Sequence, residues 1–149
     1  MKVKDLMTSE VGACAPDANL ASVVSIMWNN DCGAVPVVAD GKVVGIITDR
    51  DIAVAAATTN QPASDIPVST VINGTVYTCQ AEDGVEAAIA AMQENKVRRL
   101  PVVDADGGLL GIVSVNDLVR HAGKSTSAKS KTVATKDVVE TLKALSTAA

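Results

Sequence analysis

The hydrophobic positions in the first part of the chain change from a helical spacing to strand-like runs. The helical stripe consists of Leu20, Val23, Val24 and Met27. Two apolar runs then flank Asp40-Gly41, a dipeptide that favours a tight β-hairpin. The predicted elements are an extended piece over 11–15, a helix over 20–30, strands over 34–38 and 43–47, and a helix over 49–57.

The same order of elements returns later, so the sequence contains an internal repeat. A shift of 65 residues places Cys14 on Cys79 and Met27 on Met92, and after a one-residue insertion near Ala105 the shift is 66. Evenly spread matches with a single gap indicate a duplicated unit of about 55 residues. The second copy is predicted to contain an extended piece over 76–80, a helix over 83–95, strands over 100–103 and 109–113, and a helix over 115–122.

The repeat predicts an α+β fold in which a β-α-β-β-α unit occurs twice. One unit alone buries too little surface, so we expect the copies to stack about a pseudo-twofold axis with a cleft between them. An amphipathic helix is predicted over 136–146, with Thr135 as its N-cap and Val138, Val139, Leu142 and Leu145 on one face. The expected organisation is a first repeat over 1–57, a linker loop over 58–67, a second repeat over 68–122, a flexible linker over 123–134 and a C-terminal helix over 135–149.

Composition and charge argue against several classes of function. The net charge is −4, and Trp28 and Tyr77 are the only aromatic residues, so the chain has neither a basic patch nor a stacking platform for nucleic acid. No apolar run approaches the ~20 residues of a membrane span, and the N-terminus does not resemble a signal peptide. We therefore expect a cytoplasmic protein with no membrane contact. Trp28 lies beyond the apolar stripe, which leaves two alternatives: solvent exposure, or burial in a subunit interface.

The cysteines and the single histidine predict no metal site. Cys14, Cys32 and Cys79 are odd in number and form no CxxC pair, which favours a reducing compartment and burial as small apolar side chains. A zinc site within one chain would need carboxylate ligands at spacings that the sequence does not show. His121 is expected to cap the end of its helix, where positive charge is favoured.

One heptapeptide pattern occurs in both copies where a strand is predicted to end and a helix to begin. It reads Gly45-Ile-Ile-Thr48-Asp-Arg-Asp51 in the first copy and Gly111-Ile-Val-Ser114-Val-Asn-Asp117 in the second. One interpretation is a capping box, in which the hydroxyl and the acid satisfy the helix N-terminus. The other is a ligand site, because helix amides bind phosphate and a carboxylate can accept both hydroxyls of a ribose. The duplication and the use of Asp, which is shorter than the usual Glu, favour the ligand site.

These motifs, together with Val-Arg98-Arg99-Leu-Pro-Val-Val and Cys-Gly-Ala-Val-Pro-Val-Val, resemble the cystathionine-β-synthase (CBS) domain family. The resemblance covers about residues 1–122. It implies a tandem CBS pair that binds AMP, ADP, ATP or S-adenosylmethionine as a regulatory ligand in its clefts, with no cofactor. It also implies a homodimer in which two pairs stack through their helices into a flat disc. A chain that only senses implies an effector protein, which nothing in the sequence names, or a role as a nucleotide reservoir.

The resemblance further implies two ligand sites, each built from both copies. One set of site residues is Thr48, Arg50 and Asp51 with Tyr77, Val97 and Arg99. The other set is Ser114, Asp117 and Arg98 with Gly12, Cys32 and Ala34. The arginines are expected to contact ligand phosphate, because guanidinium groups bind phosphate bidentately. For Arg98 and Arg99 the alternative is a solvated strand edge.

The sequence features bear on three classes of function. A nucleotide-sensing module is favoured by the two intact motifs. The chain also resembles the regulatory insert of inosine-monophosphate dehydrogenase, but a catalytic barrel of about 250 residues cannot fit here, and no nucleophile–histidine set is visible. We therefore expect no enzymatic activity. The alternative to a sensor is a structural dimerisation module whose ligand sites do not function.

Overall fold

The computed structural model describes residues 1–123 and 132–146, which fall into two compact units. The first-repeat unit comprises residues 10–76 together with 106–109. The second-repeat unit comprises residues 1–9, 77–105, 110–123 and 132–146. Each unit contains one copy of the repeated pattern and has its own hydrophobic core.

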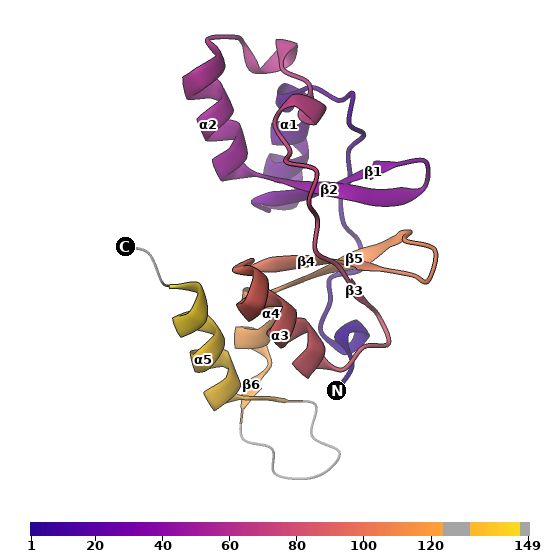
Figure 1. The fold of residues 1–149 in the computed structure, drawn as a ribbon, viewed down its shortest axis with the longest axis vertical. Coiled ribbons are helices and arrows are strands. Elements are labelled where there is room, and N and C mark those ends of the chain that lie inside the picture. The colour runs from indigo at the N-terminus through magenta and orange to yellow at the C-terminus, as the bar shows by residue number, and fades with distance from the viewer. Residues whose placement is uncertain (124–131, 147–149) are drawn as a thin grey trace. The chain divides into compact units, whose positions relative to one another are not determined.

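In the first-repeat unit, a helix, a hairpin and a second helix follow one another (Figure 1). They are α1 (Leu20–Asn30), β1 (Ala34–Ala39), β2 (Lys42–Thr48) and α2 (Asp49–Thr59), followed by the 3-10 turns η2 (Ala63–Asp65) and η3 (Val68–Thr70). β1 and β2 pair antiparallel around Asp40 and Gly41. The φ angles of these two residues, 51° and 74°, are both positive, as a tight hairpin turn requires. The predicted helices and hairpin are confirmed for this unit.

The second-repeat unit has the same order of elements and adds others. They are η1 (Val3–Asp5), β3 (Cys79–Gln80), α3 (Val85–Asn95), β4 (Arg99–Val103), β5 (Leu109–Ser114), α4 (Val115–Arg120), β6 (Ala122–Gly123), β7 (Val133–Ala134) and α5 (Thr135–Leu145). The strand order is β3-β4-β5, with β3 parallel to β4, and β6 pairs parallel with β7. The chain is thus an α+β protein with a short C-terminal helix, as the repeat predicted.

Each core is completed by a short segment that precedes the other repeat in the chain. Val3 is fully buried in the second-repeat core, and its N–H donates to the carbonyl of Asp83 at 2.9 Å. Val68, 65 positions later, is fully buried in the first-repeat core, and its N–H donates to the carbonyl of Ala18 at 2.8 Å. A compact unit is therefore not one contiguous repeat, because the segments before the two repeats are exchanged.

The C-terminal helix α5 packs against α3 and α4 within the second-repeat unit (Figure 1). Its Val138 and Thr141 are buried. Two side chains at the end of α3 reach it: Gln93 Nε2 donates to Thr141 Oγ1 at 2.9 Å, and Lys96 Nζ donates to the Ala144 carbonyl at 3.0 Å. The chain itself therefore covers the helix face of its second repeat.

Several element boundaries differ from the sequence predictions. The extended piece expected over 11–15 forms only an isolated bridge between Cys14 and Val37. The helix expected from residue 83 begins at Val85, because the Asp83 carboxylate accepts the N–H of Gln80 in the preceding turn. The helix expected over 115–122 ends at Arg120, and the chain then enters β6.

The predicted linkers and apolar stripes also need correction. Segment 58–67, expected to be a loop, begins inside α2 and contains η2. Of the flexible linker expected over 123–134, residues 124–131 lie outside the described part of the chain, and the ends form β6 and β7. Thr135 is the first residue of α5, and the N-cap is Ala134. Val24 and Val139 are each 43% exposed, because the apolar stripes are wider than the surfaces that cover them.

Candidate functional site

The acid of the first motif closes a helix cap with only one of its oxygens. Thr48 is the N-cap of α2: its Oγ1 accepts the N–H of Asp51 at 3.2 Å, and Asp51 Oδ2 accepts the N–H of Thr48 at 2.9 Å. This is the capping box considered from the sequence. Within the described residues, Asp51 Oδ1 accepts no hydrogen bond. The cap and a ligand contact are therefore compatible, because the cap uses one oxygen and leaves the other available.

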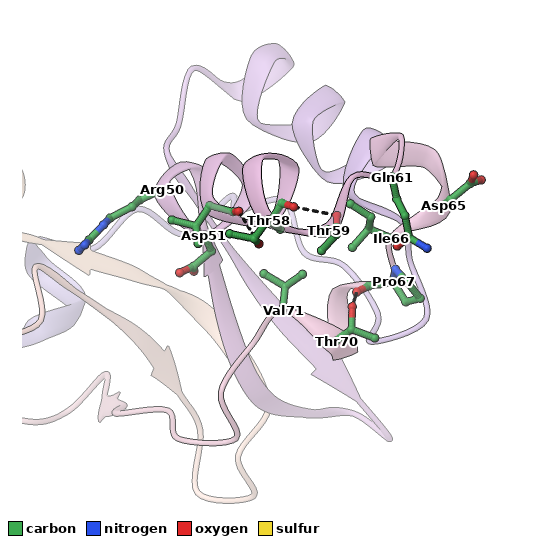
Figure 2. A pocket seen from close by; sticks show the side chains of 12 residues that line it. Arg50, Asp51, Thr58, Thr59, Gln61, Asp65, Ile66, Pro67, Thr70 and Val71 are labelled. Atoms are coloured by element: carbon green, nitrogen blue, oxygen red, sulfur yellow. Dashed lines mark hydrogen bonds between the residues drawn. The ribbon is translucent and has the colours of Figure 1, made fainter.

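Asp51 lies in the wall of a pocket of about 710 Å³ in the first-repeat unit (Figure 2). The pocket lies between α2 and the segment that carries η2 and η3, and Val54 and Ile66 contribute to its apolar wall. Thr58 and Thr70 contribute hydroxyl groups, which donate to backbone carbonyls at 2.8 Å and can still accept hydrogen bonds. An apolar wall with a few polar groups is typical of small-molecule sites.

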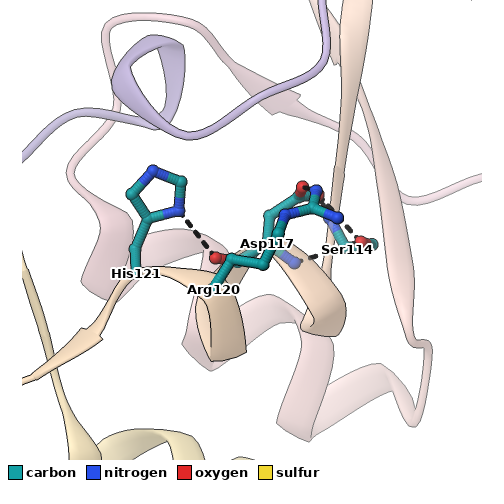
Figure 3. Close-up of polar contacts among 4 residues, drawn as sticks. All are labelled: Ser114, Asp117, Arg120 and His121. Carbon is teal, nitrogen blue, oxygen red and sulfur yellow. Dashed lines mark hydrogen bonds and ion pairs between the residues drawn. The ribbon is translucent and has the colours of Figure 1, made fainter.

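The acid of the second motif is buried, and both of its oxygens are occupied (Figure 3). The N–H and the hydroxyl of Ser114 donate to Asp117 Oδ2 at 2.7 and 2.8 Å. Asp117 Oδ1 pairs with a guanidinium nitrogen of Arg120, at the end of the same helix. Asp117 is 2% exposed. A ligand can reach this carboxylate only after Arg120 moves.

His121 ends the same helix. Its Nδ1 lies 2.9 Å from the Asp117 carbonyl and donates a hydrogen bond to it, and His121 is the C-cap residue of α4. The predicted role of His121 at the helix end is confirmed. The ring is thus engaged with the backbone of its own helix through Nδ1.

The arginines of the two motifs lie in different settings. Arg50 is exposed, and in Figure 2 its side chain extends away from Ile66 and Thr70 at the other end of the pocket. Arg98 and Arg99 line a smaller hollow of about 150 Å³ beside Ser114. Arg98 is exposed and Arg99 half-exposed. Both interpretations of this pair, a phosphate contact and a solvated strand edge, are compatible with that position.

The remaining expected site residues are divided between the units. Tyr77 is exposed, and Val97 is half-buried against the second-repeat core. Gly12 is half-buried, and Ala34 is buried at the start of β1. Cys32 is half-buried and lines a second pocket in the first-repeat unit. Each expected ligand site combines residues from both units, so the two sets stay predictions.

Sequence reasoning missed the residues that shape the pocket beside Asp51. Val54 and Thr58 follow the acid by three and seven positions on α2, so they share one helix face with it. A helical projection from Asp51 would have found them. Thr70 and Val71 come from η3 and the residue after it, and only the fold brings them to the pocket.

The glycine of the second motif is explained by packing. A Cβ at Gly111 would lie 2.5 Å from the backbone carbonyl oxygen of Thr8, whose N–H and carbonyl both bond to Ile112. Backbone at that distance leaves no room for a side chain. A glycine is therefore needed at this position because the backbone of the N-terminal segment packs against it, and no ligand contact is required to explain it.

Two of the three cysteines are buried, as expected for small apolar side chains, and the third is half-buried. Cys14 and Cys79 are buried, and burial raises the pKa of the Cys14 thiol to about 11 and that of Cys79 to about 12. All three thiols are free. Among the described residues there is no cluster of His, Cys, Asp and Glu side chains suited to a metal ion, and no helix long and apolar enough to cross a membrane.

The model of the CBS domain matches residues 3–58 and 63–124 of the chain. The chain belongs to the CBS domain family. The matched residues span both copies of the repeat, so the duplication seen in the sequence corresponds to a CBS domain pair. The two capped helix starts at Thr48 and Ser114 are the corresponding motifs of this pair.

Two relatives show how the pair occurs in other chains. The CBS domain-containing protein YhcV of Bacillus subtilis is 34% identical over 128 residues, which cover 86% of this chain and 90% of YhcV. Inosine-5'-monophosphate dehydrogenase of Mycobacterium tuberculosis is 34% identical over 117 residues, but these cover 76% of this chain and only 21% of the dehydrogenase. The likeness to the enzyme is confined to a small part of it.

Solved structures of CBS proteins resemble the fold. The CBS domain pair of protein MJ0100, in complex with 5-methylthioadenosine and S-adenosyl-L-methionine, is 26% identical with a TM-score of 0.73, covering 80% of this chain and 94% of that one. Hypoxic Response Protein I with two coordinated zinc ions is also 26% identical with a TM-score of 0.73, covering 81% of this chain and 98% of that one.

Proposed function

We propose that this chain is a regulatory module that binds an adenosine-containing ligand, with AMP, ADP, ATP and S-adenosylmethionine as candidates. The observation that carries the proposal is the free oxygen of Asp51 in the wall of a 710 Å³ pocket at the start of α2. A carboxylate there can accept ribose hydroxyls, and the helix N-terminus favours a phosphate. The ligands of the MJ0100 pair share the adenosine group, which supports this class of ligand.

We propose that Tyr77, Val97 and Arg99 complete the contacts of the ligand held by Thr48, Arg50 and Asp51. Arg50 and Arg99 supply the charge for a phosphate in this assignment. A regulatory role without a catalytic step is part of this proposal, and it is supported by a likeness to the dehydrogenase that is confined to 21% of that enzyme. Three free thiols fit a reducing cytoplasm.

Isothermal titration with adenosine, AMP, ATP and S-adenosylmethionine tests the proposal, with GMP as the base control. We expect saturable binding of at least one adenosine compound and none of GMP. Asp51→Ala should weaken that binding by about 1.5–3 kcal/mol, or ten- to hundredfold, because a charged hydrogen-bond acceptor is lost. Asp49→Ala is the matched control, because Asp49 is an exposed acid of the same helix turn that does not line the pocket.

The second candidate is a structural dimerisation module, and the occupied carboxylate of Asp117 favours it for the second motif. This candidate predicts no heat with any adenosine compound and unchanged assembly in Asp51→Ala. Binding that depends on Asp51 eliminates it. The absence of binding throughout the panel would eliminate the sensor.

We also propose that the chain forms a homodimer through one face of the first-repeat unit, the α1/α2 face, defined by Val24, Trp28, Cys32, Ile52 and Ala53. These residues line a groove of about 550 Å³. Trp28, which forms part of its wall, is 86% exposed. The flat disc implied by the family resemblance would use the helices of both repeats. In this chain α5 packs on α3 and α4, so the proposed contact uses the first repeat alone.

Equivalent positions in the two repeats support this choice of surface. Val24 is 43% exposed, whereas Ile89, 65 positions later, is 8% exposed. Trp28 corresponds to Gln93, whose side chain bonds to Thr141 of α5. The surface that α5 covers in the second repeat is therefore open in the first.

The charge pattern favours a second copy of this chain as the partner. α1 contains no charged residue, and α2 carries charge only in its first turn, at Asp49, Arg50 and Asp51. A twofold contact places a surface against itself, so the largely uncharged helix faces limit repulsion, and the two acids that also line the groove, Asp31 and Asp49, are the charges that the contact must keep apart. A protruding Trp28 beside an apolar groove lets each copy insert one side chain into the other.

Sedimentation velocity and Trp fluorescence test the dimer, because Trp28 is the only tryptophan. We expect the emission to shift to shorter wavelength with rising concentration, in step with dimer formation. Val24→Ser should weaken association at least tenfold. Val139→Ser is the matched control, since Val139 is also 43% exposed but lies on α5. A monomer at all concentrations, or equal effects of the two variants, contradicts the proposed surface.

A further inference from the structure

The two motif acids differ in the residue that follows them by three positions. On α2 this residue is Val54, which is exposed and lines the pocket of Asp51. On α4 it is Arg120, which pairs with Asp117. Residues three apart on a helix are neighbours on its surface, so each of these side chains lies over the acid of its own motif. The two positions are equivalent in the repeat, and one is apolar while the other is cationic.

We propose that the residue three positions after the motif acid decides which repeat takes the ligand. Val54 leaves Asp51 open, Arg120 closes Asp117, and the chain therefore binds one adenosine-containing ligand, at the first motif. This inference rests on the function proposed above. The family resemblance implies two ligand sites and leaves open whether both fill; on this inference the second stays empty, because Asp117 is paired with Arg120 in the folded chain.

The hydrogen bonds around each acid give the physical reason. Asp117 already accepts two donors from Ser114 and one from Arg120, and it is almost fully buried. A ribose diol would have to displace the guanidinium group, which brings a full positive charge to the buried carboxylate, whereas a ribose hydroxyl brings none. Asp51 accepts only the cap N–H, so a ribose hydroxyl meets an oxygen that has no competing donor.

The space beside each acid points to the same asymmetry. The pocket in the first-repeat unit has a volume of about 710 Å³ and includes Asp51 in its wall. The hollow in the second-repeat unit has a volume of about 150 Å³ and is lined by Arg98, Arg99 and Ser114, with Val115 and Asn116, but not by Asp117. Pockets that hold small molecules usually measure about 300–1,000 Å³. Of the two spaces beside the motif helices, the one that includes Asp51 is of that size.

Reciprocal exchange of the two residues tests the proposal. The experiment is a calorimetric titration of the full chain with the adenosine compound that binds it best, read for both affinity and stoichiometry. The parent chain should bind one equivalent. Val54→Arg should weaken this event at least tenfold, because the new guanidinium can pair with Asp51 as Arg120 pairs with Asp117. Arg120→Val should add a second binding event, because Asp117 Oδ1 loses its partner.

Two controls separate pairing from other effects. Ala57→Arg adds the same charge at an exposed position of α2, but six positions from Asp51 and so on another face, and it should leave affinity unchanged. Val54→Leu adds bulk without a donor and should weaken binding far less than Val54→Arg. Circular dichroism melting confirms that each variant is folded.

The outcomes distinguish this inference from the function on which it rests. If no adenosine compound binds the parent chain, the proposed function fails and the inference fails with it. If the parent binds two equivalents, or Val54→Arg binds as tightly as Ala57→Arg, the inference alone is overturned and the sensor remains. A single event in Arg120→Val shows that Arg120 is not what closes Asp117.

Discussion

The two repeats of this chain share one pattern but differ in what surrounds it. In the first repeat the motif acid keeps a free oxygen beside a pocket, and the α1/α2 face is open. In the second repeat the acid is buried under Arg120, and α5 covers the helix face. The two copies therefore share one order of elements, while Arg120 and the additional helix α5 give them different accessible surfaces. In the second repeat both the motif acid and the helix face are covered, whereas in the first repeat both are accessible.

This difference implies that the second repeat is the better-packed half, and core substitutions test that. Leu118 is fully buried, whereas Ile52, 66 positions earlier, is only half-buried. Leu118→Ala should lower the free energy of unfolding by about 2–5 kcal/mol. In protein dilute enough to be monomeric, Ile52→Ala should cost less than about 2 kcal/mol, because its side chain already contacts water there. Urea denaturation measures both, and equal losses would contradict the difference in packing.

The motif acids should also differ in their contribution to stability. Asp117→Ala removes the acceptor of three donors in a buried position and should cost about 2 kcal/mol or more. Asp51→Ala loses one cap bond and should cost about 1 kcal/mol. Thermal melting of the two variants without ligand compares them. A larger loss in Asp51→Ala would mean that the second acid is not structural.

The arginines offer a sharper test of which motif holds the ligand. Arg99 belongs to the set proposed around Asp51, so Arg99→Ala should reduce the preference for AMP over adenosine about tenfold, or 1.4 kcal/mol. Arg98→Ala is the neighbouring control and should change this preference less. Titrations at two salt concentrations measure both, since salt screens a phosphate contact. If neither variant changes the preference, both arginines form a solvated strand edge.

The cysteines provide the smallest expected effect. Cys14 and Cys79 occupy equivalent positions, and burial holds their pKa values near 11 and 12. In protein dilute enough to be monomeric, iodoacetamide at pH 8 should therefore label Cys32, which is half-buried, faster than either, as mass spectrometry would show. Because folding raises these pKa values, the thiols' contribution to stability is complete below the unfolded value of about 9 and falls as pH rises toward 12. Rapid labelling of Cys79 in folded protein would contradict its burial.

The sequence alone was sufficient for the repeat and for most of its elements. Apolar periodicity located α1 to the residue, and Asp40-Gly41 located the first hairpin, because both signals act within a few residues of chain. The spacing of Thr48 and Asp51, and of Ser114 and Asp117, was also sufficient to place both motifs at helix starts. These are local relations, and local physical chemistry decides them.

Tertiary structure decided everything that depends on contacts between distant segments. The apolar periodicity did not show that Val3 packs in the second-repeat core or that Val68 packs in the first-repeat core. Periodicity reports only on neighbours within one element, and these contacts join segments that are far apart in the sequence. The pocket beside Asp51 needs η3 as well as α2. Two motifs with the same spacing differ in access because Arg120 reaches Asp117 where Val54 leaves Asp51 open. Sequence thus determined where the two acids lie, and packing and charge pairing determined which of them a ligand can reach.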